Sequence, residues 1–322
     1  MPPSAPPSTA KVAAALLTVY LVWGSTYLAI AVMVETLPPL LAAGARYVVA
    51  GILMLAFLWA RARVTRTPQE RTGSAQWRAA AIVGVLLLLG GNGFVVLSEL
   101  RIPSGIAAVL VATVPIWLAV FDAVATRQRP SALAIGGILA GFIGVAILLA
   151  PVSGSDVDSI DPIGVGLVII AAISWALGSI YSRGAPMPRS ALLGTGMEML
   201  AGGVALFIAG GLVGEAANLE PATFSTASIL ALGYLIVFGS LIGFTGYVWL
   251  LGNAPISTVG TYAYVNPIVA VGLGALLHSE PVTPRTLIAG VVIIGAVVAM
   301  VSGRPRRSTE SGPLPEAASV EP

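Results

Sequence analysis

The sequence predicts an all-α integral membrane protein with ten transmembrane helices, arranged as two five-helix repeats of inverted topology. Three observations carry this prediction: the composition, the length of the apolar runs, and the distribution of basic residues. Of the 322 residues, 57% are hydrophobic and only 9% are charged, and the mean hydropathy is +0.95. A soluble domain carries about 25% charged residues, so most of this chain must face lipid.

The apolar runs are long enough for helices that cross a bilayer, which need about 20 residues each. They are too long for strands, and they lack the alternation of a membrane barrel. The first run exceeds the roughly 7–15 residues of a signal-peptide core, so we expect it to remain as a membrane helix. The predicted spans are residues 12–34, 38–60, 78–98, 104–124, 131–150, 163–183, 190–213, 226–250, 257–277 and 284–303.

Polar segments divide these spans into two repeats. Residues 1–11 and 304–322 are polar and rich in proline, which predicts disorder at both ends. Residues 151–162 form a polar loop on the outside, between a first repeat over 12–150 and a second over 163–303.

Basic residues predict the orientation of the spans through the positive-inside rule. With the N-terminus inside, eight of the 14 acidic residues fall in the outside loops, together with only two basic residues, Arg101 and Arg285. The inside connection after the eighth span departs from the rule, because it has no basic residue. We therefore expect a multi-pass protein of the cell (inner) membrane with both termini in the cytoplasm. The basic residues on the inside are Lys11, Arg61, Arg63, Arg66, Arg71, Arg78, Arg127, Arg129, Arg183, Arg189, Arg304, Arg306 and Arg307.

An offset of 152 residues brings landmarks of the two halves into register: Trp23 falls on Trp175, and Pro115 falls on Pro267. Because each half has an odd number of spans, the second half begins on the opposite side of the membrane. Such inverted repeats recur among secondary transporters, where the substrate site lies near the midplane between the halves. A chance match in a chain rich in glycine and alanine is the alternative.

Four segments carry a resemblance to a known family: "YLVWGSTYLAI" (20–30), "PSGIAAVLVATVP" (103–115), "ISWALGSIY" (173–181) and "TYAYVNPIVAV" (261–271). In this order, within a ten-span frame, they resemble the EamA-type branch of the drug/metabolite transporter superfamily. The resemblance covers about residues 15–301. It implies paired five-helix repeats, cytoplasmic termini, and often the export of amino acids or other small metabolites. It names no substrate.

Arg46 and Glu198 are the charged residues predicted deep inside spans, and the 152-residue offset superposes them. Each lies roughly 12 Å along its helix, and the two helices start from opposite sides of a core of about 30 Å, so their levels differ by about 6 Å. A charge at mid-bilayer costs at least about 2.5–3.5 kcal/mol, so both should avoid lipid. Either they form a closed pair that locks two spans, or they line a cavity. In the cavity Arg46 would bind an acidic group of the substrate, and Glu198 an amine or a proton.

Further candidates lie at the same depth or at span ends. Glu99, at the outer end of the third span, is a second candidate for proton coupling, and an ordinary solvated carboxylate is the alternative. Pro115 and Pro267 should kink their helices, either to form a binding site or only to adjust packing. The remaining candidates for substrate binding are Trp23, Ser25, Tyr27, Asn92, Trp175, Tyr262 and Asn266.

The sequence disfavours several classes of function. It has no basic helix for nucleic acid, no cysteine, one lysine (Lys11) and one histidine (His278), so neither a Walker loop nor a HExxH zinc site is present. We expect no cofactor, no metal and no enzymatic activity. The expected partners are a small-molecule substrate and the bilayer, and the chain would act as a monomer or a homodimer. The main hypothesis is a secondary transporter that works by alternating access, and an intramembrane enzyme and a passive channel are the alternatives.

Overall fold

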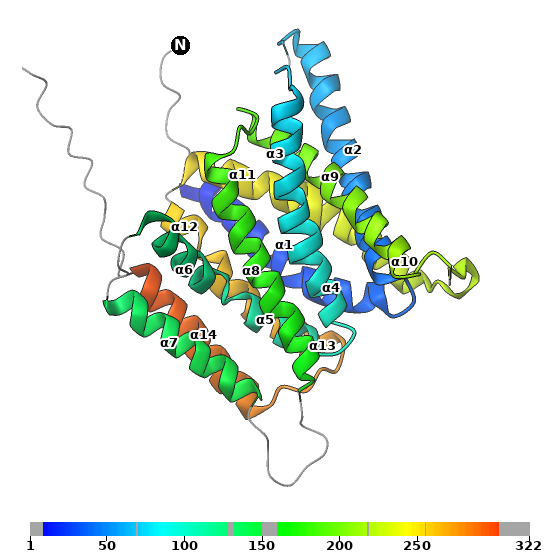
Figure 1. The fold of residues 1–322 in the computed structure, drawn as a ribbon. Coiled ribbons are helices and arrows are strands. Elements are labelled where there is room, and N and C mark those ends of the chain that lie inside the picture. The colour runs from blue at the N-terminus through cyan, green and yellow to red at the C-terminus, as the bar shows by residue number, and fades with distance from the viewer. Residues whose placement is uncertain are drawn as a thin grey trace, which may run out of the picture.

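The computed structural model describes residues 9–68, 70–127, 132–149, 160–217, 219–254 and 256–302. Every regular element within these ranges is a helix, and Figure 1 shows the helices gathered into one bundle. Seven helices are long and apolar enough to cross a membrane, and three shorter apolar helices accompany them. The chain is therefore an all-helical, multi-pass membrane protein, as the composition and the apolar runs predicted.

The first half begins with two long helices, α1 (Thr9–Val34) and α2 (Pro39–Thr65). α1 starts slightly before the predicted position at residue 12, and the tail after residue 303 lies outside the described residues. The third predicted span is one continuous helical stretch that changes its winding in the middle. It consists of α3 (Ser74–Gly84), the π-helix η1 (Val85–Gly93) and α4 (Phe94–Ser98). The half ends with α5 (Ser104–Val111), α6 (Val114–Thr126) and α7 (Ala132–Leu149).

The second half has a similar order of elements. It starts with α8 (Pro162–Gly184) and α9 (Ala191–Leu212), followed by the single 3-10 turn η2 (Pro221–Thr223). A π-helix again lies in the middle of a long stretch, made of α10 (Thr226–Tyr234), η3 (Leu235–Ile242) and α11 (Gly243–Asn253). The half ends with α12 (Ile256–Val259), α13 (Tyr262–Leu277) and α14 (Pro284–Ser302).

The two prolines that were expected to kink their spans have different positions. Pro267 lies inside α13, as predicted. Pro115 instead belongs to the first turn of α6, just after a break that separates α5 from α6. Proline is tolerated there because the first turn of a helix has no partner for its N–H group. A similar break between α12 and α13 was not predicted.

Helices of the two halves pack against each other in pairs. α2 lies along α9, α7 along α14 and α1 along α13. Figure 1 shows α7 and α14 side by side at one edge of the bundle. The contact between α2 and α9 depends on glycine: a Cβ on Gly203 would lie 2.7 Å from the backbone nitrogen of Val48, and one on Gly51 would lie 2.8 Å from that of Leu200. Small residues thus allow these two backbones to approach closely.

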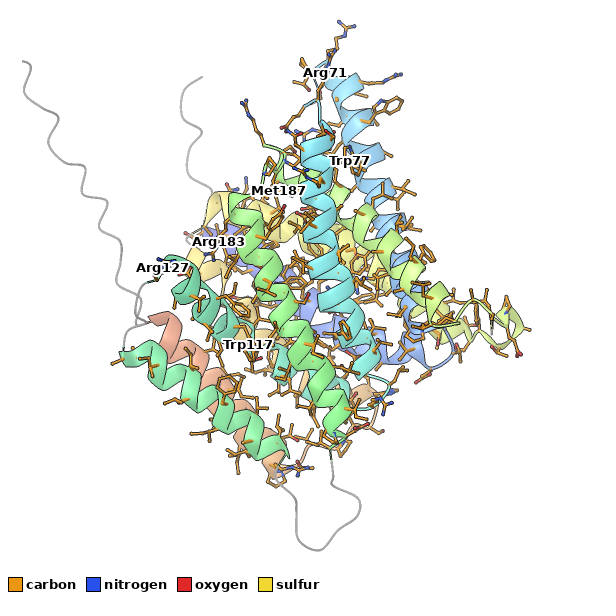
Figure 2. The ribbon with its side chains drawn as sticks, viewed as in Figure 1. Arg71, Trp77, Trp117, Arg127, Arg183 and Met187 are labelled. Atoms are coloured by element: carbon orange, nitrogen blue, oxygen red, sulfur yellow. The ribbon has the colours of Figure 1, made fainter. Side chains whose placement is uncertain are left out.

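The two ends of the bundle carry different charges. Figure 2 shows Arg71 at the top of the view and Arg183 and Arg127 on its left side, and we call the end of the bundle that holds these arginines the arginine end. Asp161 precedes α8 and Arg183 lies in its last turn, so these two residues mark opposite ends of the bundle. We call the end that holds Asp161 the acidic end.

Two loop carboxylates bind helices of the opposite half. Glu215, which follows α9, accepts hydrogen bonds from the backbone N–H groups of Leu40 and Leu41 in α2, at 3.0 and 2.8 Å. Glu70, which follows α2, accepts two backbone N–H groups immediately before α9, at 2.9 and 3.0 Å. A negative charge is favourable at these positions because the first N–H groups of a helix have no partner within the helix. The two caps therefore connect the halves reciprocally.

Candidate functional site

Arg46 is buried between the halves, with 4% of its surface exposed. Its Nε donates a hydrogen bond to the Oγ of Ser240 in η3, at 3.0 Å. Its guanidinium carbon lies 4.7 Å from the ring centroid of the adjacent Tyr47. Both contacts stabilise the charged guanidinium, one by a charge-assisted hydrogen bond and one by a cation–π interaction.

Glu198 is half-buried on α9 and does not form the closed pair that was one of the two interpretations. Among the ion pairs of the described ranges, none joins it to Arg46. The two residues belong to different helix contacts: Arg46 meets η3, whereas the backbone of Glu198 lies against Gly84 of α3. The acidic side chain that interacts electrostatically with Arg46 is Glu99.

Glu99 lies in the connection between α4 and α5; the residue is half-buried, and both of its carboxylate oxygens are buried. Neither oxygen has a hydrogen-bond partner among the residues that the structure describes. The neighbouring Arg101 turns away and pairs with Asp161 at 2.9 Å. Burial raises the pKa of the Glu99 carboxyl well above its usual range, and the carboxylate of Glu280 raises this pKa further, while the backbone of Ala31 and the charge of Arg46 lower it. A carboxyl that keeps its proton to higher pH suits a role in proton coupling.

Trp23 is surrounded by aromatic rings from the second half. Its ring centroid lies 5.3 Å from that of Phe244, 5.1 Å from that of Tyr247 and 5.1 Å from that of Tyr262. Its indole N–H donates a hydrogen bond to the carbonyl oxygen of Gly239 in η3, at 3.2 Å. The structure therefore brings together Trp23 and Tyr262, two of the predicted site residues, beside the same π-helix that binds Arg46.

Three other predicted residues also lie on α1 and α13. The Oγ of Ser25 is 2.6 Å from the hydroxyl of Tyr234, at the end of α10. Tyr27 packs against an apolar cluster that includes Ile106, and its hydroxyl interacts electrostatically with Glu99. Asn266 is buried on α13, and its Oδ1 has no hydrogen-bond partner. An acceptor left without a donor in this way is available to a ligand that carries an N–H group.

Asn92 and Trp175 lie apart from this group, at the other π-helix. The Nδ2 of Asn92 donates a hydrogen bond to the carbonyl oxygen of Leu87 within η1, at 3.4 Å. The ring of Trp175 fills the space beside Gly91 of η1, and the ring of Trp23 fills the space beside Gly243 next to η3. Each tryptophan therefore packs against a glycine of the opposite half.

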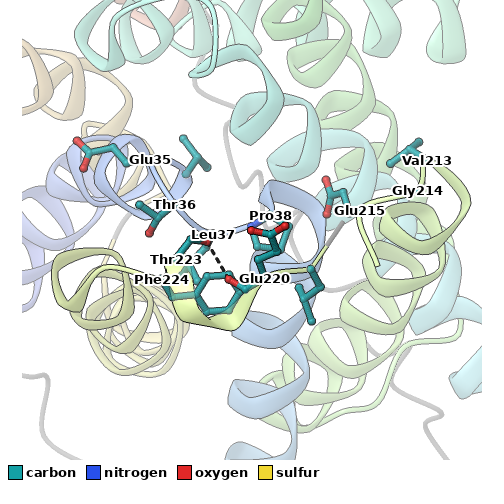
Figure 3. A pocket seen from close by; sticks show the side chains of 12 residues that line it. Glu35, Thr36, Leu37, Pro38, Val213, Gly214, Glu215, Glu220, Thr223 and Phe224 are labelled. Carbon is teal, nitrogen blue, oxygen red and sulfur yellow. Dashed lines mark hydrogen bonds between the residues drawn. The ribbon is translucent and has the colours of Figure 1, made fainter. Parts of the chain in front are cut away.

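Two pockets open at the acidic end. Figure 3 shows the first, of about 360 Å³, with Glu35, Glu215 and Glu220 around it. The second, of about 370 Å³, is lined by Ala31, Val34, Glu35, Glu99, Leu100, Arg101, Ile102, Pro103, Ser104, His278 and Glu280. We call it the Glu99 pocket. Arg46 lines neither pocket, so in this conformation neither of them reaches the buried cation.

The two π-helices and the loop carboxylates Glu70, Glu215 and Glu280 were not predicted as features of the site. A π-helix is commonly found at functional sites, but no residue pattern in the two segments distinguishes it from α-helix. The carboxylates act on helices that are distant in the chain, so only the tertiary structure reveals their partners. Glu70 accepts two backbone N–H groups, and these bonds lower the pKa of its carboxyl below the usual range.

Comparison with known proteins identifies the family. The EamA-like transporter family matches the sequence twice, over residues 10–150 and over residues 162–302. The chain belongs to this family. The resemblance seen in the four short segments is thereby confirmed. The described residues hold no group of three His, Cys, Asp or Glu side chains that could bind a metal ion.

This EamA-type protein is similar to several transporters over nearly its whole length. It is 41% identical over 294 residues to the uncharacterized inner membrane transporter YedA of Escherichia coli (strain K12), which covers 90% of each chain. It is 25% identical over 295 residues to the uncharacterized transporter YvbV of Bacillus subtilis, covering 91% of this chain and 92% of the relative. The family and these relatives are transporters, so the protein is a membrane transporter and not an enzyme.

Two further comparisons concern efflux and fold. The EamA-type protein is 26% identical over 302 residues to a probable amino-acid metabolite efflux pump of Salmonella typhimurium (strain LT2), covering 91% of this chain and 95% of the relative. A solved crystal structure with 20% sequence identity aligns with a TM-score of 0.59, over 91% of this chain and 96% of the other. The similarity to that structure concerns the fold alone.

Proposed function

We propose that this EamA-type protein is a secondary transporter that exports small metabolites, such as amino acids or related amphiphiles, by alternating access. The buried Arg46 carries the proposal. Its guanidinium is held by Ser240 and Tyr47 and has no ion-pair partner among the residues that the structure describes. A permanent charge at this depth is costly when it has no counter-ion, and such residues are therefore usually functional. A substrate carboxylate would supply the missing counter-charge.

The two halves form an inverted repeat that rocks about this site. The proposal is supported by the two matches of one family and by the matching positions of η1 and η3. The reciprocal packing of Trp23 on Gly243 and of Trp175 on Gly91 adds support, because both pairs obey the same 152-residue offset. In such transporters the substrate site is exposed to one side at a time.

The substrate carries both an acidic and a basic group. Arg46 binds its carboxylate, and the unpartnered Oδ1 of Asn266 accepts a hydrogen bond from its ammonium group. Trp23 and Tyr262 offer ring faces to its side chain. An amino acid carries both of these groups. A substrate of this class agrees with the name of the relative from Salmonella typhimurium, a probable amino-acid metabolite efflux pump.

Transport is coupled to protons through Glu99 or Glu198. Glu99 has the stronger support, because its buried oxygens have no partner and its charge acts on Arg46. A substrate carboxylate at Arg46 and an ionised Glu99 would compete for the same cation, which links substrate binding to proton binding.

The arginine end faces the cytoplasm, and the protein resides in the inner membrane. The positive-inside rule favours this orientation, since the labelled arginines in Figure 2 gather at one end. The relative from Escherichia coli is named an inner membrane transporter.

Reconstituted vesicles test the proposal. The purified full-length protein is screened for uptake of labelled amino acids and aromatic amines, with and without an imposed pH gradient. We expect saturable uptake of at least one amino acid, and an accumulation ratio that follows the gradient. Flux that never saturates would indicate a channel, and chemical conversion of a substrate would indicate an enzyme. If none of these compounds exchanges across the membrane, the proposed substrate class is wrong.

A further inference from the structure

The Glu99 pocket contains two carboxylates in very different environments. Glu280 accepts hydrogen bonds from the backbone N–H groups of Ser104 and Gly105, in the first turn of α5, at 2.9 and 3.0 Å. The charge of Glu280 is therefore well stabilised, since two free N–H groups and the positive end of the helix face it. This contact fastens the loop after α13 to the start of α5.

Glu280 fits at this position only because α13 leaves space for it. Its Oε2 lies 2.5 Å from where a Cβ on Gly274 would stand. The N–H of Glu280 donates a hydrogen bond to the carbonyl oxygen of Gly274, at 3.0 Å. The carboxylate is thus enclosed between α5 and the last turn of α13. The positive end of α5 attracts the Glu280 carboxylate. The negative end of α13, which ends at Leu277, repels it.

Glu99 lies in the same pocket with both oxygens buried and without a hydrogen-bond partner. The side chain of Ser104 nearby is buried too, and its Oγ also has no partner. An ionised carboxylate in this position would be costly, because no donor of the described residues lies within hydrogen-bond distance, and the backbone of Ala31 and the charge of Arg46 offset only part of the lost hydration. It would also repel Glu280, with which it interacts electrostatically. A proton on Glu99 removes both penalties.

The other titratable or charged groups around Glu99 come from four directions. Tyr27 on α1 and Arg46 on α2 interact with it from within the bundle. Arg101, in the same connection, is occupied by Asp161. His278 and Glu35 also line the pocket, and the Nε2 of His278 is 3.8 Å from Oε1 of Glu35. An imidazole has one nitrogen that can donate a hydrogen bond and one that can accept it, so His278 can relay a proton to or from the pocket.

We propose that Glu99 and Glu280 form a latch that is operated by a proton. While Glu99 is protonated, Glu280 stays bound to the first turn of α5 and the Glu99 pocket remains narrow. When Glu99 loses its proton through the His278–Glu35 pair, the new charge repels Glu280. The loop after α13 then leaves α5, and the pocket opens toward the interior. The purpose of the latch rests on the proposed transport function, since it would link proton release to access from the acidic end.

The test uses the absence of natural cysteine in the chain. Ser104→Cys places one thiol beside the Glu280 carboxylate, at a position where the serine is 1% exposed. The purified full-length variant in detergent is treated with methyl methanethiosulfonate at pH 6 and at pH 8.5, and mass spectrometry gives the rate of modification. Ser104→Cys/Glu99→Gln is the matched control, because it has the same thiol but no ionisable group at position 99.

We expect the single variant to react at least about tenfold faster than the control at pH 8.5 and equally fast at pH 6, since the ionised fraction of a carboxyl falls about tenfold for each pH unit below its pKa. Ser104→Cys/Glu280→Gln should react faster than the matched control at both pH values, because the carboxylate that closes the pocket is absent. Ile102→Cys, in the same connection, provides a second reporter if the first variant folds poorly. A rate ratio that does not change with pH in either reporter would rule out the latch. Because the modification assay contains no substrate, its result does not bear on the proposed transport function. Likewise, a failure of the vesicle uptake assay does not bear on the latch.

Discussion

At the scale of single residues, Arg46 is held by protein groups and not by a counter-ion. Ser240 and Tyr47 fix its guanidinium, and Glu99 acts on it without an ion pair within 4.0 Å in the described residues. This arrangement leaves donor groups of the guanidinium available for a carboxylate. The residue therefore combines a fixed position with unused hydrogen-bonding capacity, as a preorganised binding group requires.

We predict that Arg46→Ala abolishes transport and that Arg46→Lys retains only a fraction of it. Removing one partner of a buried charge pair costs about 2–5 kcal/mol, which corresponds to a loss of at least about 30-fold in apparent affinity. Lysine keeps the charge but lacks the planar fork that binds a carboxylate with two hydrogen bonds. Uptake kinetics in vesicles measure both effects.

Ser240→Ala is the control for this comparison, because it removes the group that positions Arg46 and leaves the charge in place. We expect a smaller loss than in Arg46→Ala. Uptake by Arg46→Ala, Arg46→Lys and Ser240→Ala that equals that of the unmodified protein, at equal amounts of inserted protein, would contradict a substrate-binding role for Arg46.

A second residue-scale prediction concerns Glu70 at the arginine end. The hydrogen bonds from the backbone lower its pKa in the folded protein. Its stabilising effect is therefore complete above the pKa of an unfolded glutamate, about 4.3, and is lost as the pH falls through the folded value. Glu70→Gln should lower the melting temperature in detergent at pH 7 and lower it by less at pH 3.

Glu220→Gln, on an exposed loop at the other end of the bundle, is the matched control. It should not alter the melting temperature at either pH. A similar decrease for Glu70→Gln at both pH values would mean that the carboxylate charge contributes nothing to this cap.

At the scale of helices, the contact between α2 and α9 depends on the absence of side chains. Gly203→Ala would place a Cβ 2.7 Å from the backbone nitrogen of Val48, so the helices would have to move apart. Overpacking of this kind costs about 1–3 kcal/mol. We predict a clear decrease in thermal stability for Gly203→Ala, measured by melting in detergent.

Gly166→Ala on α8 is the control, because no atom lies within 4 Å of the added Cβ. Replacing an unconstrained helical glycine by alanine stabilises a helix by about 0.5–1 kcal/mol. The two substitutions should therefore act in opposite directions. If Gly203→Ala were as stable as Gly166→Ala, the two backbones would not be in close contact.

The helices themselves were largely predictable, because a bilayer demands long apolar runs and each predicted span contains helix. Their interruptions were harder to predict. Pro115 was expected inside a helix but begins α6, since proline alone does not determine on which side of it a helix breaks. The π-helices depend on a single extra residue per turn, which leaves hydropathy unchanged.

The site was predictable only in part, for a similar reason. Depth in the membrane can be counted along a helix, and Arg46 proved buried. The direction in which a side chain leaves its helix depends on neighbouring helices, and Glu198 does not meet Arg46. Glu99 lies in a connection, where hydropathy suggests solvent, but tertiary packing buries its oxygens.

At the scale of the whole molecule, the proposed orientation predicts which parts of the surface a reagent can reach. Single cysteines at the exposed residues Thr67 and Ala222 lie at the arginine end and the acidic end, respectively. A membrane-impermeant maleimide should label Ala222→Cys in intact cells. It should label Thr67→Cys only after the membrane is opened. Labelling in the reverse order would invert the proposed orientation.

The reciprocal caps of Glu70 and Glu215 have a consequence for biogenesis. When the first half leaves the ribosome, the amides of Leu40 and Leu41 are already formed, but the carboxylate that binds them has not yet been synthesised. Glu70, in turn, emerges before the two amides that it binds, which immediately precede α9. Each half therefore enters the bilayer with a helix end or a carboxylate whose hydrogen-bond partner lies in the other half. Neither half can complete its folding without the other. We expect the two halves, made as separate polypeptides, to accumulate only when they are produced together.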